Sequence, residues 1–137
     1  MKIFLDANVL VSVLNREYPV YHFSSRVLSL ADNPKFKVYT SPLCLAIAFY
    51  FAEKKSGSKA REKITLLASM LQISPVSEKN VQEVCRNKRI HDFEDGLQYY
   101  SALESGCKMI ITEDGHDFYF SEIEVLNSRQ FLENYVI

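Results

Sequence analysis

The sequence lacks the features that mark repeat, linker or disulfide-rich proteins. It contains no internal repeat, no low-complexity segment and no linker, so its 137 residues are expected to form one domain, residues 1–137. Its three cysteines, Cys44, Cys85 and Cys107, are odd in number and include no Cys-x-x-Cys pair. This usage favours small buried side chains in a reducing compartment over disulfides or a zinc site.

Net charge and long apolar runs are also nearly absent. The formal net charge is −1, so any contact with nucleic acid must rest on local basic patches. The longest apolar stretch, residues 43–52, is about half the ~20 residues of a membrane span. The N-terminus is interrupted by Asp6 and Asn8, unlike a signal peptide. We therefore expect a cytoplasmic protein that does not enter a membrane.

What is present is an alternation of short apolar strands and longer helical patterns. It predicts an α/β fold with three layers, in which a small parallel sheet is flanked by helices. The expected strands are 2–6, 37–40, 73–76, 108–112 and 123–126, and the expected helices are 7–15, 21–30, 42–55, 59–71, 77–87, 92–105 and 128–135.

Three of these helices carry signals at their ends or along their length. Ser41 and Pro42 begin a helix that is apolar nearly all round, which predicts burial between neighbouring elements. Gly106 follows the helix over 92–105 as a typical C-terminal cap residue. Ser128 is expected to cap the last helix.

Acidic residues follow two of the strands. Asp6 ends the first strand, and Asp114 and Asp117 lie in the loop after the strand over 108–112. The carboxyl ends of parallel strands meet at one edge of a sheet, where ligands of α/β proteins bind. Asp92 and Asp95 begin the preceding helix and share one face at i, i+3 spacing. Each acid alone is also explained by a helix cap or a turn.

Together, carboxylates in one cleft repel each other, and protons or a divalent cation must relieve that repulsion. Ligands that are all oxygen, without His or Cys partners, favour Mg²⁺ or Mn²⁺ over Zn²⁺. Such ions serve phosphoryl chemistry, because they clamp a phosphodiester oxygen and lower the pKa of a bound water.

These motifs, in this order, resemble those of the PIN domain family. The resemblance rests on Asp6-Ala7-Asn8, on Asp92 to Gln98, on Ile110 to Asp114 with Asp117-Phe118, and on a closing strand and helix over 123–132. It spans essentially the whole chain. It implies a metal-dependent endoribonuclease, because the members of this family are metal-dependent ribonucleases. Many single-domain bacterial members are toxins of the VapC type that pair with an antitoxin protein, so it also implies such a partner. It leaves a homodimer open.

The resemblance also implies roles for individual residues. Asp6 would be the first metal ligand and Asp95 the acid of the late helix, while either Asp114 or Asp117 would be the fourth acid. Asn8 and Thr112 would support the ion's ligands. The implied catalytic residues are therefore Asp6, Asp95, Asp114 and Asp117, and the implied metal ligands are Asp6, Asp92, Asp95 and Asp114.

One position departs from the family pattern. The second acid, usually Glu early in the helix over 42–55, is replaced by Ile47. Glu53 lies six residues further on, about 240° around the axis, so it cannot take that place. Asp92 or Glu94 could supply the carboxylate. The alternative function is a weakened PIN-like module that binds RNA or a protein partner without cleavage.

Two basic clusters flank the acidic positions. Lys54 and Lys55 form one, and Arg86, Lys88 and Arg89 form the other. Both are expected to bind RNA phosphates, although a solvated surface explains them equally well. A third interpretation, a phospho-acceptor receiver-like domain, is disfavoured because the second strand ends in Thr40-Ser41 instead of an acid.

Overall fold

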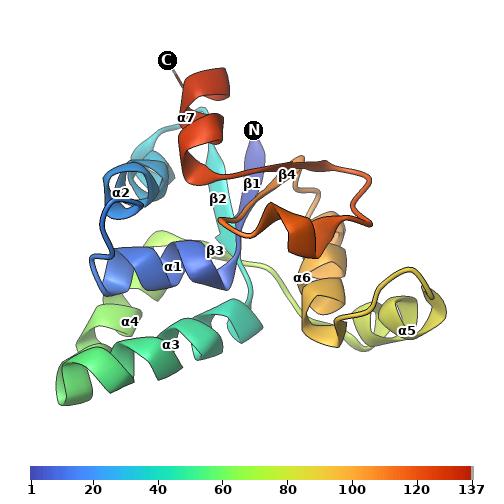
Figure 1. Cartoon of the computed structure of the whole chain (residues 1–137), viewed down its shortest axis with the longest axis horizontal. Helices are drawn as coiled ribbons and strands as arrows, with labels where there is room; N and C mark the ends of the chain where they lie inside the picture. The colour runs from blue at the N-terminus through green and yellow to red at the C-terminus, as the bar shows by residue number, and fades with distance from the viewer. Residues whose placement is uncertain (137) are drawn as a thin grey trace.

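The computed structural model describes residues 1–136 and has a parallel five-stranded sheet at its centre (Figure 1). The strand order is β3-β2-β1-β4-β5, and every neighbouring pair is parallel. The strands are β1 (Lys2–Leu5), β2 (Lys37–Thr40), β3 (Gln72–Ile73), β4 (Met109–Ile111) and β5 (Glu124–Leu126). The predicted α/β class and parallel sheet are confirmed.

Helices cover both faces of the sheet. Figure 1 shows α1, α2 and α7 on one side of the strands and α5 and α6 on the other, while α3 packs against α1 and α4. The helices are α1 (Ala7–Leu14), α2 (Tyr21–Ser29), α3 (Pro42–Ser56), α4 (Ala60–Met70), α5 (Glu78–Arg86), α6 (Phe93–Glu104) and α7 (Ser128–Tyr135), with 3₁₀ turns η1 (Leu30–Asp32), η2 (Gly57–Lys59) and η3 (Gly115–Phe118). In the described part of the chain, no helix has the length and apolar character needed to cross a membrane.

The chain reverses its direction across the sheet between β1 and β4. From β1 the connections lead through β2 to β3 at one edge, and the next crossover places β4 on the other side of β1. Such a reversal opens a crevice at the carboxyl ends of the two strands. Asp6 follows β1 and Thr112 follows β4, so both lie at this crevice.

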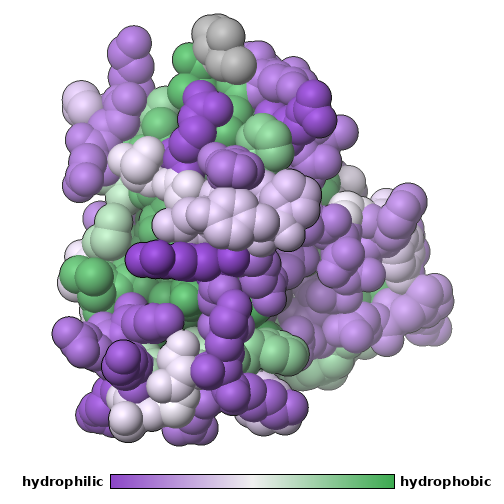
Figure 2. Space-filling model, turned by 60° about the vertical axis from the view of Figure 1, so that its left-hand side comes forward, coloured by the Kyte–Doolittle hydropathy of each residue, from purple (hydrophilic) through white to green (hydrophobic). Residues whose placement is uncertain are grey.

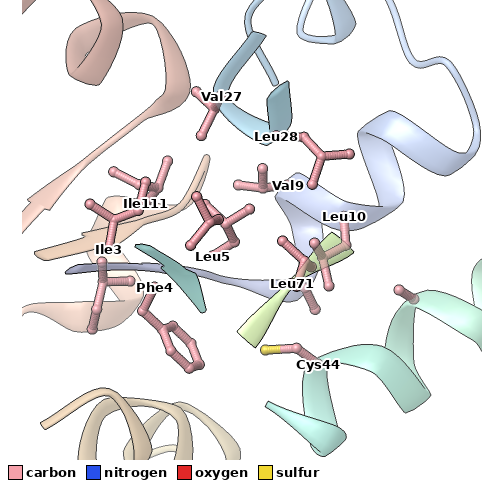
Figure 3. Packing of buried hydrophobic residues seen from close by; sticks show 14 of the residues in the cluster. Ile3, Phe4, Leu5, Val9, Leu10, Val27, Leu28, Cys44, Leu71 and Ile111 are labelled. Atoms are coloured by element: carbon pink, nitrogen blue, oxygen red, sulfur yellow. The ribbon is translucent and has the colours of Figure 1, made fainter. Parts of the chain in front are cut away.

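The core explains why β1 has no polar alternation. Ile3, Phe4 and Leu5 are fully buried, because helices cover the strand on both faces. Figure 3 shows Leu5 pointing toward Val9 of α1, while Phe4 points to the opposite side, toward α6. A strand held this firmly fixes the position of the residue that follows it, Asp6.

Two predictions about helices were wrong. Helix α3 is not enclosed by its neighbours: its small residues Cys44, Ala48 and Ala52 are buried, whereas Tyr50 is 52% exposed and Phe51 44% exposed. The N-cap of α7 is Asn127, whose side chain accepts from the backbone N–H of Gln130, and not Ser128.

Two glycines set the packing of α6. A Cβ at Gly96 would lie 2.8 Å from Cγ1 of Val84 and 2.9 Å from Cγ2 of Ile90, so only glycine allows α5 and its following loop to approach this closely. Gly106 has a φ of 77° and ends the helix, as predicted. The close approach of α5 fixes the start of α6, which carries Asp95.

Candidate metal-dependent nuclease site

Asp6 is the anchor of the site, and its carboxylate is held on both oxygens. Its Oδ1 accepts from the backbone N–H of Ala7 at 2.8 Å, so Asp6 is the N-cap of α1. Its Oδ2 accepts from the Thr112 hydroxyl at 2.9 Å. The backbone N–H of Asp6 donates to the Ile111 carbonyl at 3.0 Å. Asp6 therefore caps α1 and also lies at the crevice between the ends of β1 and β4.

Asn8 and Thr112 connect this anchor to the loop after β4. The Asn8 amide Nδ2 donates to Thr112 Oγ1 at 3.0 Å and to Asp114 Oδ2 at 3.4 Å. The backbone N–H of Glu113 donates to Asn8 Oδ1 at 3.1 Å. Asn8 and Thr112 therefore hold the Asp114 loop against Asp6.

Four of the five predicted acids, from three distant segments, line one cleft of about 330 Å³. Asp6 comes from the end of β1, Asp95 from the first turn of α6, and Asp114 and Asp117 from the η3 loop. The full lining is Asp6, Ala7, Asn8, Val11, Glu17, Ile47, Phe51, Glu94, Asp95, Asp114 and Asp117.

Among the acids of the cleft, Asp6 and Asp95 have the most strongly raised pKa values. Burial raises the pKa of Asp6 to about 6, with a further rise from the charges of Glu94 and Asp117, against the opposing hydrogen bonds from Ala7 and Thr112. Burial also raises the pKa of Asp95 to about 7, and the charge of Asp92 is the next contribution. The charges of Asp117 and Asp6, which lie across the cleft, raise the pKa of Asp95 further.

Asp92, which was predicted as a metal ligand, lies outside the cleft, whereas Glu94, the other candidate for the missing carboxylate, lies in it. Asp92 is the N-cap of α6, where its Oδ1 accepts from the backbone N–H of Asp95 at 3.0 Å, and it does not line the cleft. Glu94 lines the cleft, and burial raises its pKa, with Asp92 adding to the rise. Within residues 1–136, no three acidic, His or Cys side chains converge on one point suited to an ion.

None of the five basic residues predicted to bind RNA lines the acidic cleft. Lys54 lies over the Tyr50 ring, with Nζ 4.4 Å from the centroid, and Lys55 donates to the Asn15 carbonyl at the end of α1. The other three basic residues border a separate hollow beside Tyr100, formed by Glu83, Arg86, Asn87, Lys88 and Arg89.

Glu17 and Phe51 line the cleft but were not predicted from the sequence. Glu17 lies in the connection after α1, where no periodic pattern marks its direction. Phe51 lies one turn after Ile47 on α3, and the i, i+4 spacing would have placed them on one face. Phe51 was overlooked because α3 was expected to be buried on all sides.

Comparison with known proteins agrees with this arrangement. A family model described as the PIN domain matches residues 2–116. The chain belongs to the PIN domain family. It is also 30% identical to Ribonuclease VapC1 of Aquifex aeolicus (strain VF5), over 98% of this chain and 95% of that protein. The predicted family is confirmed.

Solved structures share the PIN fold. VapBC2 from Rickettsia felis, bound to a DNA fragment from its promoter, contains a chain that superposes with a TM-score of 0.70. The two are 21% identical, over 93% of this chain and 98% of that one. VapC20 of Mycobacterium tuberculosis, a Sarcin-Ricin loop cleaving toxin, gives 0.62 at 16% identity, over 79% and 86%.

The raised pKa values predict how the stability of this PIN domain depends on pH. Between about pH 4 and pH 7 the folded protein holds more protons on Asp6 and Asp95 than the unfolded chain, so its free energy of unfolding falls as pH rises. Asp6 contributes on the order of 3 kcal/mol to this fall, and Asp95, which is half exposed, contributes less because solvent screens it.

Urea unfolding in EDTA at pH 5 and pH 8 measures this dependence. Asp95→Asn should reduce the fall in stability, whereas Glu53→Gln, an exposed acid outside the cleft, should leave it unchanged. Equal slopes for the wild type and Asp95→Asn would contradict the raised pKa of Asp95.

Proposed function

We propose that the protein is a metal-dependent endoribonuclease and the toxin of a VapC-type toxin-antitoxin pair. The observation that carries this proposal is the meeting of Asp6, Asp95 and the Asp114–Asp117 segment in one cleft at the strand crevice. The similarity to Ribonuclease VapC1 over nearly the whole of both chains supports the same reaction. The protein would act in the cytoplasm, where its RNA substrate is.

The residues of the cleft suit a hard divalent cation, Mg²⁺ or Mn²⁺. They offer carboxylates and the Asn8 amide, with no His or Cys among the lining side chains. When bound, such an ion supplies electrostatic stabilisation to a phosphodiester and activates water for its hydrolysis. Asp114, Asp117 and Glu94 are exposed, so their side chains have room to turn toward Asp6 and Asp95.

Each residue has a defined task in this proposal. Asp6 and Asp95 hold the ion, and Asp114, Asp117 and Glu94 provide the remaining carboxylates, with Asp92 adjacent at the start of α6. Thr112 fixes Asp6 through its hydroxyl, and Asn8 fixes the loop of Asp114. The basic residues of α3 and of the loop after α5 would hold RNA phosphates outside the cleft, which the acids themselves repel.

Cleavage of structured RNA by the purified protein tests the proposal. We expect cleavage with Mg²⁺ or Mn²⁺, none in excess EDTA, and recovery when the ion is restored. Cleavage that persists unchanged in EDTA would refute a metal-dependent mechanism.

A second candidate function is binding without cleavage, and Ile47 favours it. Ile47 lines the cleft where the family usually has an acid, so the site has one ligand fewer. A protein that binds RNA or its partner but does not cleave with any divalent ion would support this candidate instead.

The antitoxin would dock away from the acids. An apolar groove of about 250 Å³ lies between α1, α2 and α4, and Leu66 on its border is 65% exposed. Figure 2, in which this side of the molecule comes forward, shows hydrophobic surface among hydrophilic side chains. The groove is lined by Val13, Leu14, Arg16, Tyr21, Leu28, Lys63, Leu66, Leu67 and Met70. Such a groove suits the apolar face of a partner helix.

Leu66→Glu should weaken binding of the antitoxin encoded beside this gene by at least about tenfold, because it places a charge in an apolar contact. RNA cleavage should not change. Thr65→Glu, which adds the same charge one residue away and outside this groove, is the control. Calorimetry measures the affinity, and light scattering on the same samples shows whether the protein alone is a homodimer. Equal effects of both variants would place the antitoxin elsewhere.

A further inference from the structure

The acidic cleft has an apolar wall that ion binding does not use. Ile47 and Phe51 lie one turn apart on α3 and line the cleft together with Val11 of α1. Phe51 is 44% exposed, although its neighbour in the helix, Ala52, is fully buried. The cleft therefore has carboxylates at the strand ends and an exposed aromatic ring on α3.

We propose that this wall binds one unpaired nucleobase of the RNA substrate, stacked on the ring of Phe51 and next to the phosphodiester that is to be cleaved. The inference rests on the proposed ribonuclease function and defines the form of RNA that the site accepts. Every base has an apolar face that stacks on an aromatic ring. In a duplex those faces are covered by neighbouring base pairs, so the base must be unpaired.

The charges around Phe51 favour a base over a phosphate at this wall. Glu17 lines the same cleft, and a carboxylate repels a phosphate but accepts hydrogen bonds from the amino groups of a base. Ile47 extends the apolar wall toward Asp6 and Asp95, where an acid would place a charge against the base. In this proposal, Ile47 contributes to base binding by keeping the wall apolar.

The turn of α3 that carries Phe51 is anchored to α1, and the Phe51 ring contacts a neighbouring ring. The carbonyl of Phe51 accepts from the Asn15 amide at 3.4 Å, which connects this turn of α3 to the end of α1. The Tyr50 ring meets the Phe51 ring edge to face, with 5.2 Å between centroids, and Lys54 lies over Tyr50. Lys54 is exposed, and in this proposal its ammonium group pairs with the phosphate of a neighbouring nucleotide.

Binding of a short single-stranded oligoribonucleotide, followed by fluorescence anisotropy with Ca²⁺ replacing Mg²⁺, tests the inference. Phe51→Ala should weaken binding by about tenfold or more, and Phe51→Tyr should keep it within about threefold. Binding of a fully paired duplex should not change. Tyr135→Ala removes a partly exposed aromatic ring from α7, outside the cleft, and should have no effect.

A second readout uses the absence of tryptophan from the sequence. Phe51→Trp introduces a single indole whose emission should be quenched by the oligoribonucleotide, whereas Tyr135→Trp should not respond. If the wild type cleaves RNA but Phe51→Ala binds the single strand normally, the inference fails and the proposed function stands. If Phe51→Ala weakens only antitoxin binding, the wall belongs to a protein partner and the inference fails. If the wild type neither binds nor cleaves RNA, the proposed function fails as well.

Discussion

Asp95→Asn is expected to lower RNA cleavage by more than about 100-fold while it makes the ion-free protein more stable at neutral pH. Activity falls because a carboxylate that would hold the ion becomes a neutral amide, a loss larger than the 10–100-fold typical for residues that only support a ligand. Stability rises because burial and neighbouring acids make an ionised Asp95 unfavourable. Opposite changes in the two quantities exclude unfolding as the cause of lost activity.

Cleavage assays with Mg²⁺ and Mn²⁺, together with urea unfolding in EDTA, measure both effects. Asp6→Asn should lower activity similarly, but Asp6 also accepts from Ala7 and Thr112, so its effect on stability is mixed. Glu53→Gln is the matched control. Full activity of Asp95→Asn would remove Asp95 from the site and with it the proposed mechanism.

The positions of the acids could be predicted because strand ends are easy to locate. Ile3 to Leu5 and Met109 to Ile111 are continuous apolar runs, and a parallel sheet brings the residues after them together. The pairing of β1 with β4 places Leu5 opposite Ile111, so Asp6 and Thr112 must be neighbours. Strand patterning therefore predicts the centre of the site without any knowledge of side-chain contacts.

The walls of the cleft could not be predicted in the same way. Which face of α3 is covered depends on how closely α1 and α4 approach it, and Ala48 and Ala52 allow contact on a narrow face only. The direction of Glu17 depends on a turn in which Arg16 has a φ of 50°, a conformation that no periodic pattern reveals. The place of Asp92 could not be predicted either, because its side chain caps α6 and does not line the cleft.

Ile47 lines the cleft at the position where the resemblance to PIN domains implies an acid, which makes a gain of function testable. Ile47→Glu should add a carboxylate to the cleft and tighten Mn²⁺ binding by about tenfold or more, because affinity for hard cations rises with the number of charged oxygen ligands. The same substitution should destabilise the ion-free protein, since it adds a like charge near Asp6 and Asp95. Ile47→Gln provides the same length of side chain without the charge and should show neither effect.

Calorimetry of Mn²⁺ binding and cleavage rates at low ion concentration distinguish the two proposed functions. If the chain is a nuclease limited by its ion, Ile47→Glu should raise cleavage at low Mn²⁺ and lower single-strand binding, because the charge interrupts the wall that Phe51 continues. If the chain is a binding module, tighter ion binding should appear without cleavage. An unchanged affinity for Mn²⁺ would show that position 47 does not reach the ion, and the acids of β1, α6 and the η3 loop would then form the complete site.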